Sequence, residues 1–156
     1  MKPGSYTQMY VQLVFAVKHR DALLTKEIRP VVFQYISGII TIMNHKSIIV
    51  NGVSDHIHIF IGLNPAKSVS DTIHGIKRNS SLFINKEKLC KGKFAWQEGF
   101  GGFTYSRSHI NNVYNYILRQ EQHHAKNRFR DEYLEFLKKF EVEYDDRYLF
   151  NFFDDV

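Results

Sequence analysis

The sequence predicts an α+β fold: a ferredoxin-like (RRM-like) split βαβ antiparallel sheet with helices packed on it and an additional C-terminal helix. Two observations support this prediction. Segments rich in β-branched and aromatic residues alternate with segments whose apolar residues recur every three or four positions, in the order β-α-β-β-α-β-α. The length of 156 residues suits one compact domain with a substantial core.

The first half of the chain contains three predicted strands and one predicted helix. Residues 10–17 form a run of mostly β-branched and aromatic side chains, which is typical of a strand. Thr25 is a good N-cap for a helix that ends near Asn44, because apolar residues follow it at helical spacing. Two further strands are expected at residues 47–53 and 56–62.

The second half contains the remaining elements. Asn64-Pro65 ends the third strand, and Ser68 or Ser70 can cap the next helix. Ser108 is placed to cap a helix that starts at His109. The predicted ranges are a helix to about residue 88, short strands at 94–96 and 103–106, a helix over 109–126 and a final helix over 131–140.

Charge is distributed unevenly along the chain. Six of the 16 acidic residues but only one of the 21 basic residues, Arg147, lie in residues 141–156. Residues 1–140 therefore carry a net charge of +10, which favours binding of a polyanion such as nucleic acid. A solvated basic surface is the alternative interpretation.

Cysteine content and hydropathy exclude several classes of protein. Cys90 is the single cysteine, which excludes a disulfide framework and a cysteine-based zinc site. Residues 1–6 lack the apolar core of a signal peptide, and no run approaches the ~20 apolar residues of a membrane span. We therefore expect a cytoplasmic protein.

Two histidines stand out in the third predicted strand. His56 and His58 are two residues apart, so they point to the same face of the strand, while Ile57, Ile59 and Ile61 point to the other. Imidazoles at this spacing can bind one divalent cation. By itself this pattern fits exposed polar residues alternating with core isoleucines at least as well.

The helix predicted at 109–126 carries a tyrosine and a glutamine one turn apart. Tyr116 and Gln120 lie outside the apolar stripe of this helix, on a second row. If this row faced the histidines, the carboxamide would complete a metal site with the phenol adjacent. Helical spacing alone favours the alternative, in which Tyr116 is a rim aromatic and Gln120 a solvated polar residue.

Basic and aromatic residues in the middle of the chain are candidates for contacts with DNA. Cations could follow a phosphate backbone, and aromatic rings in a glycine-rich loop could stack on unpaired bases. A solvated helix face and a flexible connector are the alternatives. The candidate DNA-binding residues are Lys77, Arg78, Asn79, Ser81, Trp96, Phe100 and Arg107.

In this order, the motifs resemble a known family. Four segments are similar to those of single-tyrosine HUH transposases. They are Asp-His-Ile-His-Ile-Phe at 55–60, Ile-Lys-Arg-Asn-Ser-Ser at 76–81, Trp-Gln-Glu-Gly-Phe-Gly at 96–101, and the segment 113–124 around Tyr116. These are small enzymes of insertion sequences that lack terminal inverted repeats. The resemblance runs from about Tyr6 to Tyr148. It implies one HUH transposase domain at 1–140, with the acidic and aromatic tail at 141–156 as part of it.

The resemblance also implies a reaction. Tyr116 would be the nucleophile that forms a 5′-phosphotyrosine, and its helix would therefore be the catalytic helix. His56, His58 and Gln120 would hold Mg²⁺ or Mn²⁺. The substrate would be single-stranded DNA with hairpins near the element ends. The protein would be a homodimer in which the Tyr116 helix can complete the partner's active site in trans. The alternative functions are a non-catalytic module that binds single-stranded nucleic acid and a domesticated HUH nuclease.

Overall fold

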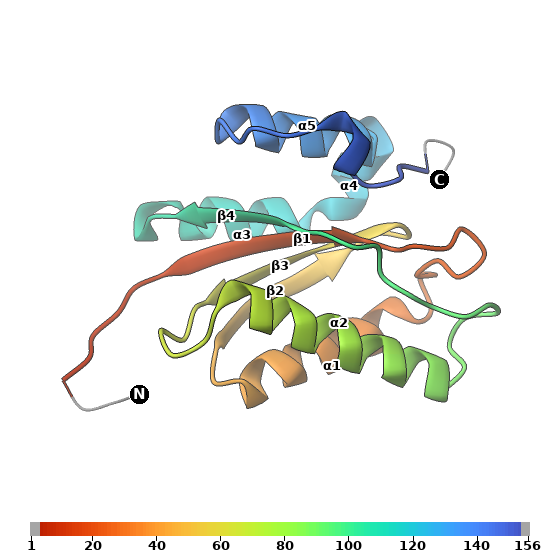
Figure 1. Cartoon of the computed structure of the whole chain (residues 1–156), viewed down its shortest axis with the longest axis horizontal. Coiled ribbons are helices and arrows are strands. Elements are labelled where there is room, and N and C mark those ends of the chain that lie inside the picture. Colours follow the sequence, from red (N-terminus) through yellow and green to blue (C-terminus); the bar gives the residue numbers. More distant parts are fainter. Residues whose placement is uncertain (1–3, 154–156) are drawn as a thin grey trace.

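A computed structural model describes residues 4–153 as a four-stranded antiparallel sheet with helices on both faces (Figure 1). The strand order is β2-β3-β1-β4, which is the split βαβ arrangement expected from the sequence. The strands are β1 (Tyr10–Ala16), β2 (Lys46–Gly52), β3 (His56–Gly62) and β4 (Gly101–Tyr105).

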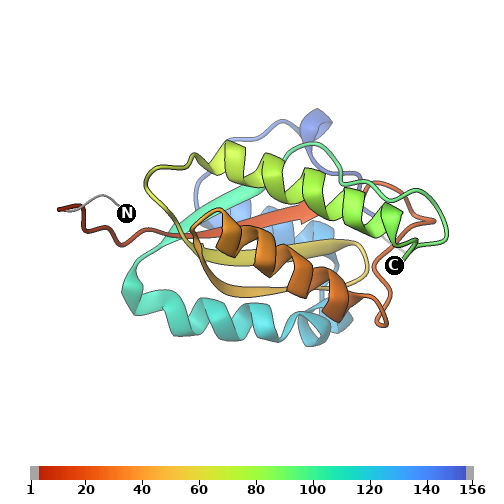
Figure 2. The ribbon, with the colours of Figure 1, turned by 90° about the horizontal axis from the view of Figure 1, so that it is seen from below.

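Two long helices cover one face of the sheet. They are α1 (Arg29–Ile42) and α2 (Val69–Lys86), and Figure 2 shows them lying side by side across the strands. The isoleucines of β3 point toward this face and are fully buried with residues such as Ile36 and Ile76. Ser68 caps α2, as predicted, by accepting a hydrogen bond from the backbone N–H of Asp71 at 2.9 Å.

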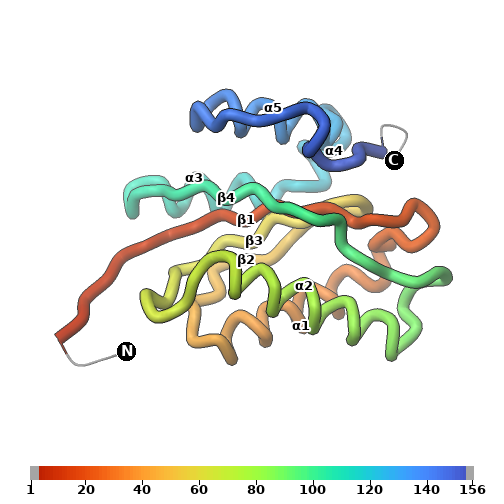
Figure 3. The backbone as a smooth tube through the Cα atoms, viewed as in Figure 1, coloured from red at the N-terminus to blue at the C-terminus, as the bar shows by residue number. Residues whose placement is uncertain are grey.

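Three helices lie on the other face. α3 (Ile110–Leu118) packs on β2 and β3, and α4 (Gln120–Lys126) leads from it into α5 (Phe129–Lys139). Figure 3 traces this path from β4 to α5, which forms its own layer over the sheet. The end of the described chain returns along α5, where Phe150 is buried against Phe129 and Tyr133.

The helix predicted at 109–126 is interrupted. Arg119 has φ −97° and ψ 26°, and it separates α3 from α4. The side chain of Asn51 donates hydrogen bonds to the carbonyl oxygens of Ile117 at 2.9 Å and Leu118 at 3.2 Å. Since a side chain that binds helical carbonyl groups disrupts the i→i+4 ladder, a contact from β2 ends α3 here.

Other predicted boundaries also need correction. The expected strand at 94–96 is a single bridge between Val17 and Trp96. The next strand starts at Gly101 rather than at 103. The helix predicted at 131–140 begins at Phe129, and the helix predicted from Thr25 begins at Arg29. None of the helices within residues 4–153 has the length and apolar character that a membrane span requires.

Candidate active site

The two histidines of β3 lie on the face of the sheet that α3 and α5 cover. In the antiparallel register with β1, His58 lies opposite Val14 and His56 lies opposite Ala16. Both imidazoles are buried, with exposed fractions of 1% for His56 and 0% for His58. The prediction that they share one face is therefore correct, but they are interior residues and not exposed polar ones.

Each imidazole is held in place through its Nδ1 atom. His56 Nδ1 lies 2.7 Å from a carboxylate oxygen of Asp55, and His58 Nδ1 lies 2.8 Å from the amide nitrogen of Gln12. Gln12 in turn accepts a hydrogen bond from the hydroxyl of Tyr105 at 2.8 Å. Such contacts orient the rings, so the two Nε2 atoms point toward a common position.

A carboxylate from α5 lies at that common position. Glu132 Oε1 is 3.1 Å from Nε2 of His56 and 3.1 Å from Nε2 of His58. The ligand atoms of these three residues all lie within 4.8 Å of one another, a grouping that could hold a metal ion. Two imidazole nitrogens and a carboxylate oxygen are ligands suited to a divalent transition metal.

Tyr116 and Gln120 reach the same carboxylate from the opposite side. The phenol of Tyr116 donates a hydrogen bond to Glu132 Oε2, and its ring packs edge-on to His58 with centroids 6.0 Å apart. Gln120 is buried, and its amide nitrogen lies 3.4 Å from the same oxygen. The structure thus brings together the three expected metal ligands and the expected nucleophile, and adds Glu132 between them.

Burial and pairing shift the pKa values of these groups in different directions. Burial favours a lower pKa for His56, but the hydrogen bonds with Asp55 and Glu132 outweigh it and raise the pKa to about 9. Burial lowers the pKa of His58, and pairing with Glu132 offsets only part of this effect. Without a bound cation, these shifts favour a protonated His56 beside a neutral His58.

The acid and the phenol are also shifted. Burial favours a higher pKa for Glu132, but the two histidines hold it well below its usual range. Burial, together with the nearby carboxylate of Glu132, raises the pKa of Tyr116 above its ordinary value. At neutral pH an ionised carboxylate thus accepts a hydrogen bond from a neutral phenol.

Glu132, Asp55 and Gln12 are site residues that sequence reasoning missed. Glu132 is 74 residues from His58, and the helix pattern around it marks only an ordinary exposed acid. Asp55 directly precedes the first histidine, and an acid at that position is a signal that could have been used. Gln12 is a polar residue inside an otherwise apolar strand, which is a second usable signal.

Two of the candidate DNA-binding residues form hydrogen bonds within the protein. Trp96 is 8% exposed, donates a hydrogen bond to Ser80 Oγ at 2.9 Å and packs edge-on against Phe15. Lys77 donates to the carbonyl oxygens of Gln97 and Gly99, each at 2.7 Å, and burial lowers its pKa to about 8. Both residues thus form hydrogen bonds with or within the segment between α2 and β4, and their contact with DNA stays a prediction.

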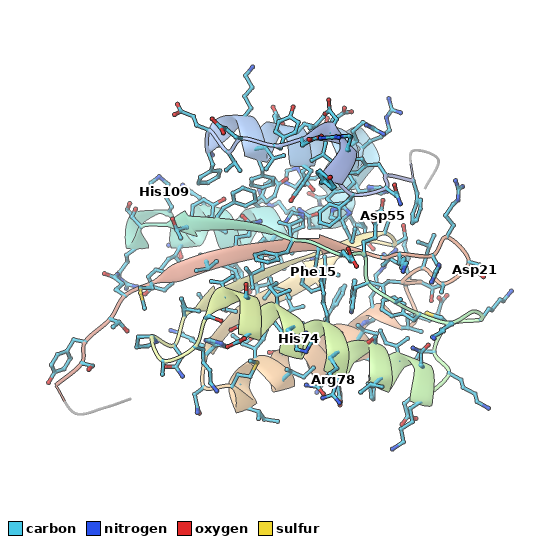
Figure 4. All side chains as sticks on the ribbon, viewed as in Figure 1. Phe15, Asp21, Asp55, His74, Arg78 and His109 are labelled. Atoms are coloured by element: carbon cyan, nitrogen blue, oxygen red, sulfur yellow. The ribbon has the colours of Figure 1, made fainter. Side chains whose placement is uncertain are left out.

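The other candidates are spread over the molecule. Arg78 and Asn79 are exposed on α2, and Figure 4 shows Arg78 on the far side of the sheet from α5. Ser81 donates a hydrogen bond to the carbonyl oxygen of Lys77 at 2.8 Å. Phe100, at 36% exposed, and the exposed Arg107 flank β4. The structure does not bring these residues together around Tyr116.

Comparison with known proteins was made for the sequence and for the fold. A family model described as IS200-like transposase matches residues 5–120. A comparison with curated protein sequences finds no significant match. The fold is similar to a crystal structure of a candidate transposase from Deinococcus radiodurans R1, with a TM-score of 0.61 and 19% identity over 77% of this chain and 96% of that one.

A second solved structure has the same fold. It is described as a REP-associated tyrosine transposase bound to a REP hairpin, and its TM-score is 0.57 with 14% identity over 80% of this chain and 74% of that one. The family match ends at Gln120, so α5 and Glu132 lie outside the matched residues.

Proposed function

Since this chain belongs to the IS200-like transposase family, we propose that it cleaves and rejoins single-stranded DNA with Tyr116 as the nucleophile. The substrate we assign is DNA with hairpins near the ends of a mobile element. A similar solved structure is described as bound to a REP hairpin, which supports this substrate class. The observation that carries the proposal is the contact of one phenol, two imidazoles and one carboxylate in a buried cluster.

A divalent cation fits the donor set of this cluster. His56, His58 and Glu132 would hold it, and Gln120 would contribute its amide oxygen if its carboxamide group were flipped. When bound there, Mg²⁺ or Mn²⁺ neutralises charge on the scissile phosphate and orients it for in-line attack. The contacts of Asp55 and Gln12 with the Nδ1 atoms keep the Nε2 atoms directed at this position.

Tyr116 supplies the attacking oxygen. The bond between the phenolic oxygen and phosphorus forms as the bond to the 3′ oxygen breaks. The phenol loses its proton and the 3′ oxygen gains one, which leaves a 5′-phosphotyrosine and a 3′-hydroxyl. Glu132 accepts the hydrogen bond of the phenol and so holds the attacking oxygen in place. A second 3′-hydroxyl can then attack the phosphotyrosine, reverse the step and join new DNA ends.

The test is the formation of a covalent adduct. Labelled single-stranded oligonucleotides with the DNA flanking this gene are incubated with the protein and Mn²⁺, Mg²⁺ or a chelator, then separated in SDS. We expect a metal-dependent adduct that is absent in Tyr116→Phe and present in Tyr114→Phe, an exposed neighbour on the same helix.

Two outcomes would contradict the proposal. An adduct that persists in Tyr116→Phe would overturn the assignment of the nucleophile. Metal-independent binding of the oligonucleotide with no adduct, unchanged in His56→Ala, would favour a non-catalytic nucleic-acid-binding module instead.

A further inference from the structure

A cleft of about 780 Å³ lies between α3, α5 and the end of β4, immediately beside the active site. Tyr116 and Glu132 both line it, so its inner end is the position where the scissile phosphate would lie. Ligand pockets of roughly 300 to 1,000 Å³ hold small organic molecules. The cleft is therefore large enough for a single nucleotide.

The middle of the cleft is apolar and aromatic. Tyr105 and Phe136 are among its lining residues, and Val113 contributes an aliphatic surface from α3. Phe136 is itself held by stacking on Phe103, with centroids 5.1 Å apart. Ordered aromatic surfaces of this kind bind unpaired bases by stacking.

The outer end of the cleft carries positive charge. Lys138 and Lys139, in the last turn of α5, line it and are exposed. Glu132 and Lys139 are separated by about 10 Å along the helix axis, at 1.5 Å per residue. This distance separates an inner phosphate position from an outer one, with room for one sugar and base between them.

The acidic and amide groups of the cleft limit where each part of a nucleotide can lie. Glu135 lies on the same helix face and disfavours a phosphate in the middle of the cleft, where the base is expected. Gln12 is buried, and its amide is occupied by Tyr105 and His58. Asn112, exposed on α3, is the amide placed to reach an edge of the base.

We propose that this cleft binds one unpaired deoxynucleotide next to the scissile phosphate, with its base against the aromatic lining formed by Tyr105 and Phe136 and its outer phosphate at Lys138 and Lys139. The inference rests on the proposed function and specifies how that site holds its substrate. Half of the cleft comes from α5, which lies beyond the residues that the family model matches. The subsite is thus a feature of this chain's C-terminal region.

The test uses thymidine 3′,5′-bisphosphate and its deoxyadenosine analogue as single-nucleotide probes. Each is titrated into the full-length protein with Mg²⁺, and backbone amide shifts are followed by NMR, which detects weak binding. We expect shifts concentrated in α3 and α5. Asn112→Trp, which fills the cleft, should weaken binding at least tenfold, whereas Asn111→Trp, exposed and outside the cleft, should change it less than twofold.

A second variant tests the charged end without adding bulk. Lys138→Ala combined with Lys139→Ala should weaken binding of the bisphosphates at least fivefold, and the amide spectrum should otherwise be unchanged. Shifts located elsewhere, or equal affinity in Asn112→Trp and Asn111→Trp, would overturn the subsite. Adduct formation is measured separately: an adduct without cleft binding refutes only the subsite, whereas cleft binding without an adduct refutes the Tyr116 reaction.

Discussion

Tyr116 donates its phenolic hydrogen bond to Glu132, a carboxylate that lies 16 residues later in the chain and on a different helix. The other oxygen of the same carboxylate contacts both histidines. Glu132 therefore connects the proposed nucleophile to the proposed metal ligands. In this arrangement α5 is part of the active site and not only a cover over the sheet.

The first prediction concerns Glu132 as a metal ligand. Glu132→Gln removes the anionic oxygen that both imidazoles face, so we expect Mn²⁺ affinity to fall at least tenfold in isothermal titration calorimetry. Glu135→Gln, an exposed acid one turn further along α5, removes the same charge and should leave affinity within twofold. Equal losses in both variants would show a general charge effect instead.

The second prediction concerns the identity of the metal. Two of the proposed ligands are imidazole nitrogens, and Mg²⁺ prefers oxygen ligands. We therefore expect Mn²⁺ to bind more tightly than Mg²⁺ when both are titrated into the same protein by calorimetry. Equal or higher affinity for Mg²⁺ would count against His56 and His58 as direct ligands.

The third prediction concerns the stability of the metal-free protein between pH 6.5 and 9. The pKa of His56 is raised from 6.5 to about 9 in the folded state. Protonated His56 therefore stabilises the fold fully below pH 6.5, and this stabilisation is lost as the pH rises toward 9. This rise corresponds to on the order of 3 kcal/mol. Urea unfolding should show the decrease in free energy.

The control for this pH dependence is a matched pair of variants. Glu132→Gln removes one partner of His56, so its profile should be flatter over the same range. Glu135→Gln should keep the slope of the unmodified protein. A profile of the unmodified protein that is flat from pH 6.5 to 8 would show that His56 is not held in its protonated form. Above pH 8, Lys77, whose pKa is lowered to about 8, contributes a change of opposite sign.

The fourth prediction concerns the contact between β4 and α5. A Cβ atom at Gly101 would lie 2.8 Å from the ring of Tyr133, which is buried, whereas a Cβ at Gly102 would meet its nearest atom at 3.5 Å. We expect Gly101→Ala to lower the free energy of unfolding by about 1–3 kcal/mol. It should also weaken metal binding, because α5 carries Glu132.

Gly102→Ala is the control for that substitution. It makes the same chemical change one residue away, so its free energy of unfolding should stay within about 1 kcal/mol of the unmodified protein. Urea denaturation and calorimetry with Mn²⁺ measure the two effects. Similar behaviour of the two variants would mean that α5 does not depend on the close approach at Gly101.

The fifth prediction concerns whether the active site forms within one chain. His56, His58, Glu132 and Tyr116 of a single chain meet in the structure. A mixture of His56→Ala and Tyr116→Phe chains should therefore form no more adduct than either variant alone. Restored adduct formation would demonstrate that Tyr116 of one chain acts with His56 of its partner. That trans arrangement requires the homodimer suggested by the family resemblance.

Much of the scaffold followed from local patterns. β1, β3 and α2 lie close to their predicted bounds, because burial of one face imposes a period of two on strands and of about 3.6 on helices. The pairing of His56 with His58 followed from the same period. The break at Arg119 did not, because its cause is the side chain of Asn51 on another element.

The sequence alone therefore determined the order of the main strands, the shared face of the histidines and the position of Tyr116 and Gln120 in a helical segment, which the structure divides into α3 and α4. Tertiary structure decided which groups meet them. Asp55 could have been recognised from its position, but Glu132 could not, because its contact depends on the way α5 packs over the sheet. Local periodicity contains no information about a contact between residues 74 positions apart. For the same reason, the sequence could not show that Trp96 and Lys77, which it predicts as nucleic-acid contacts, also form hydrogen bonds within the protein.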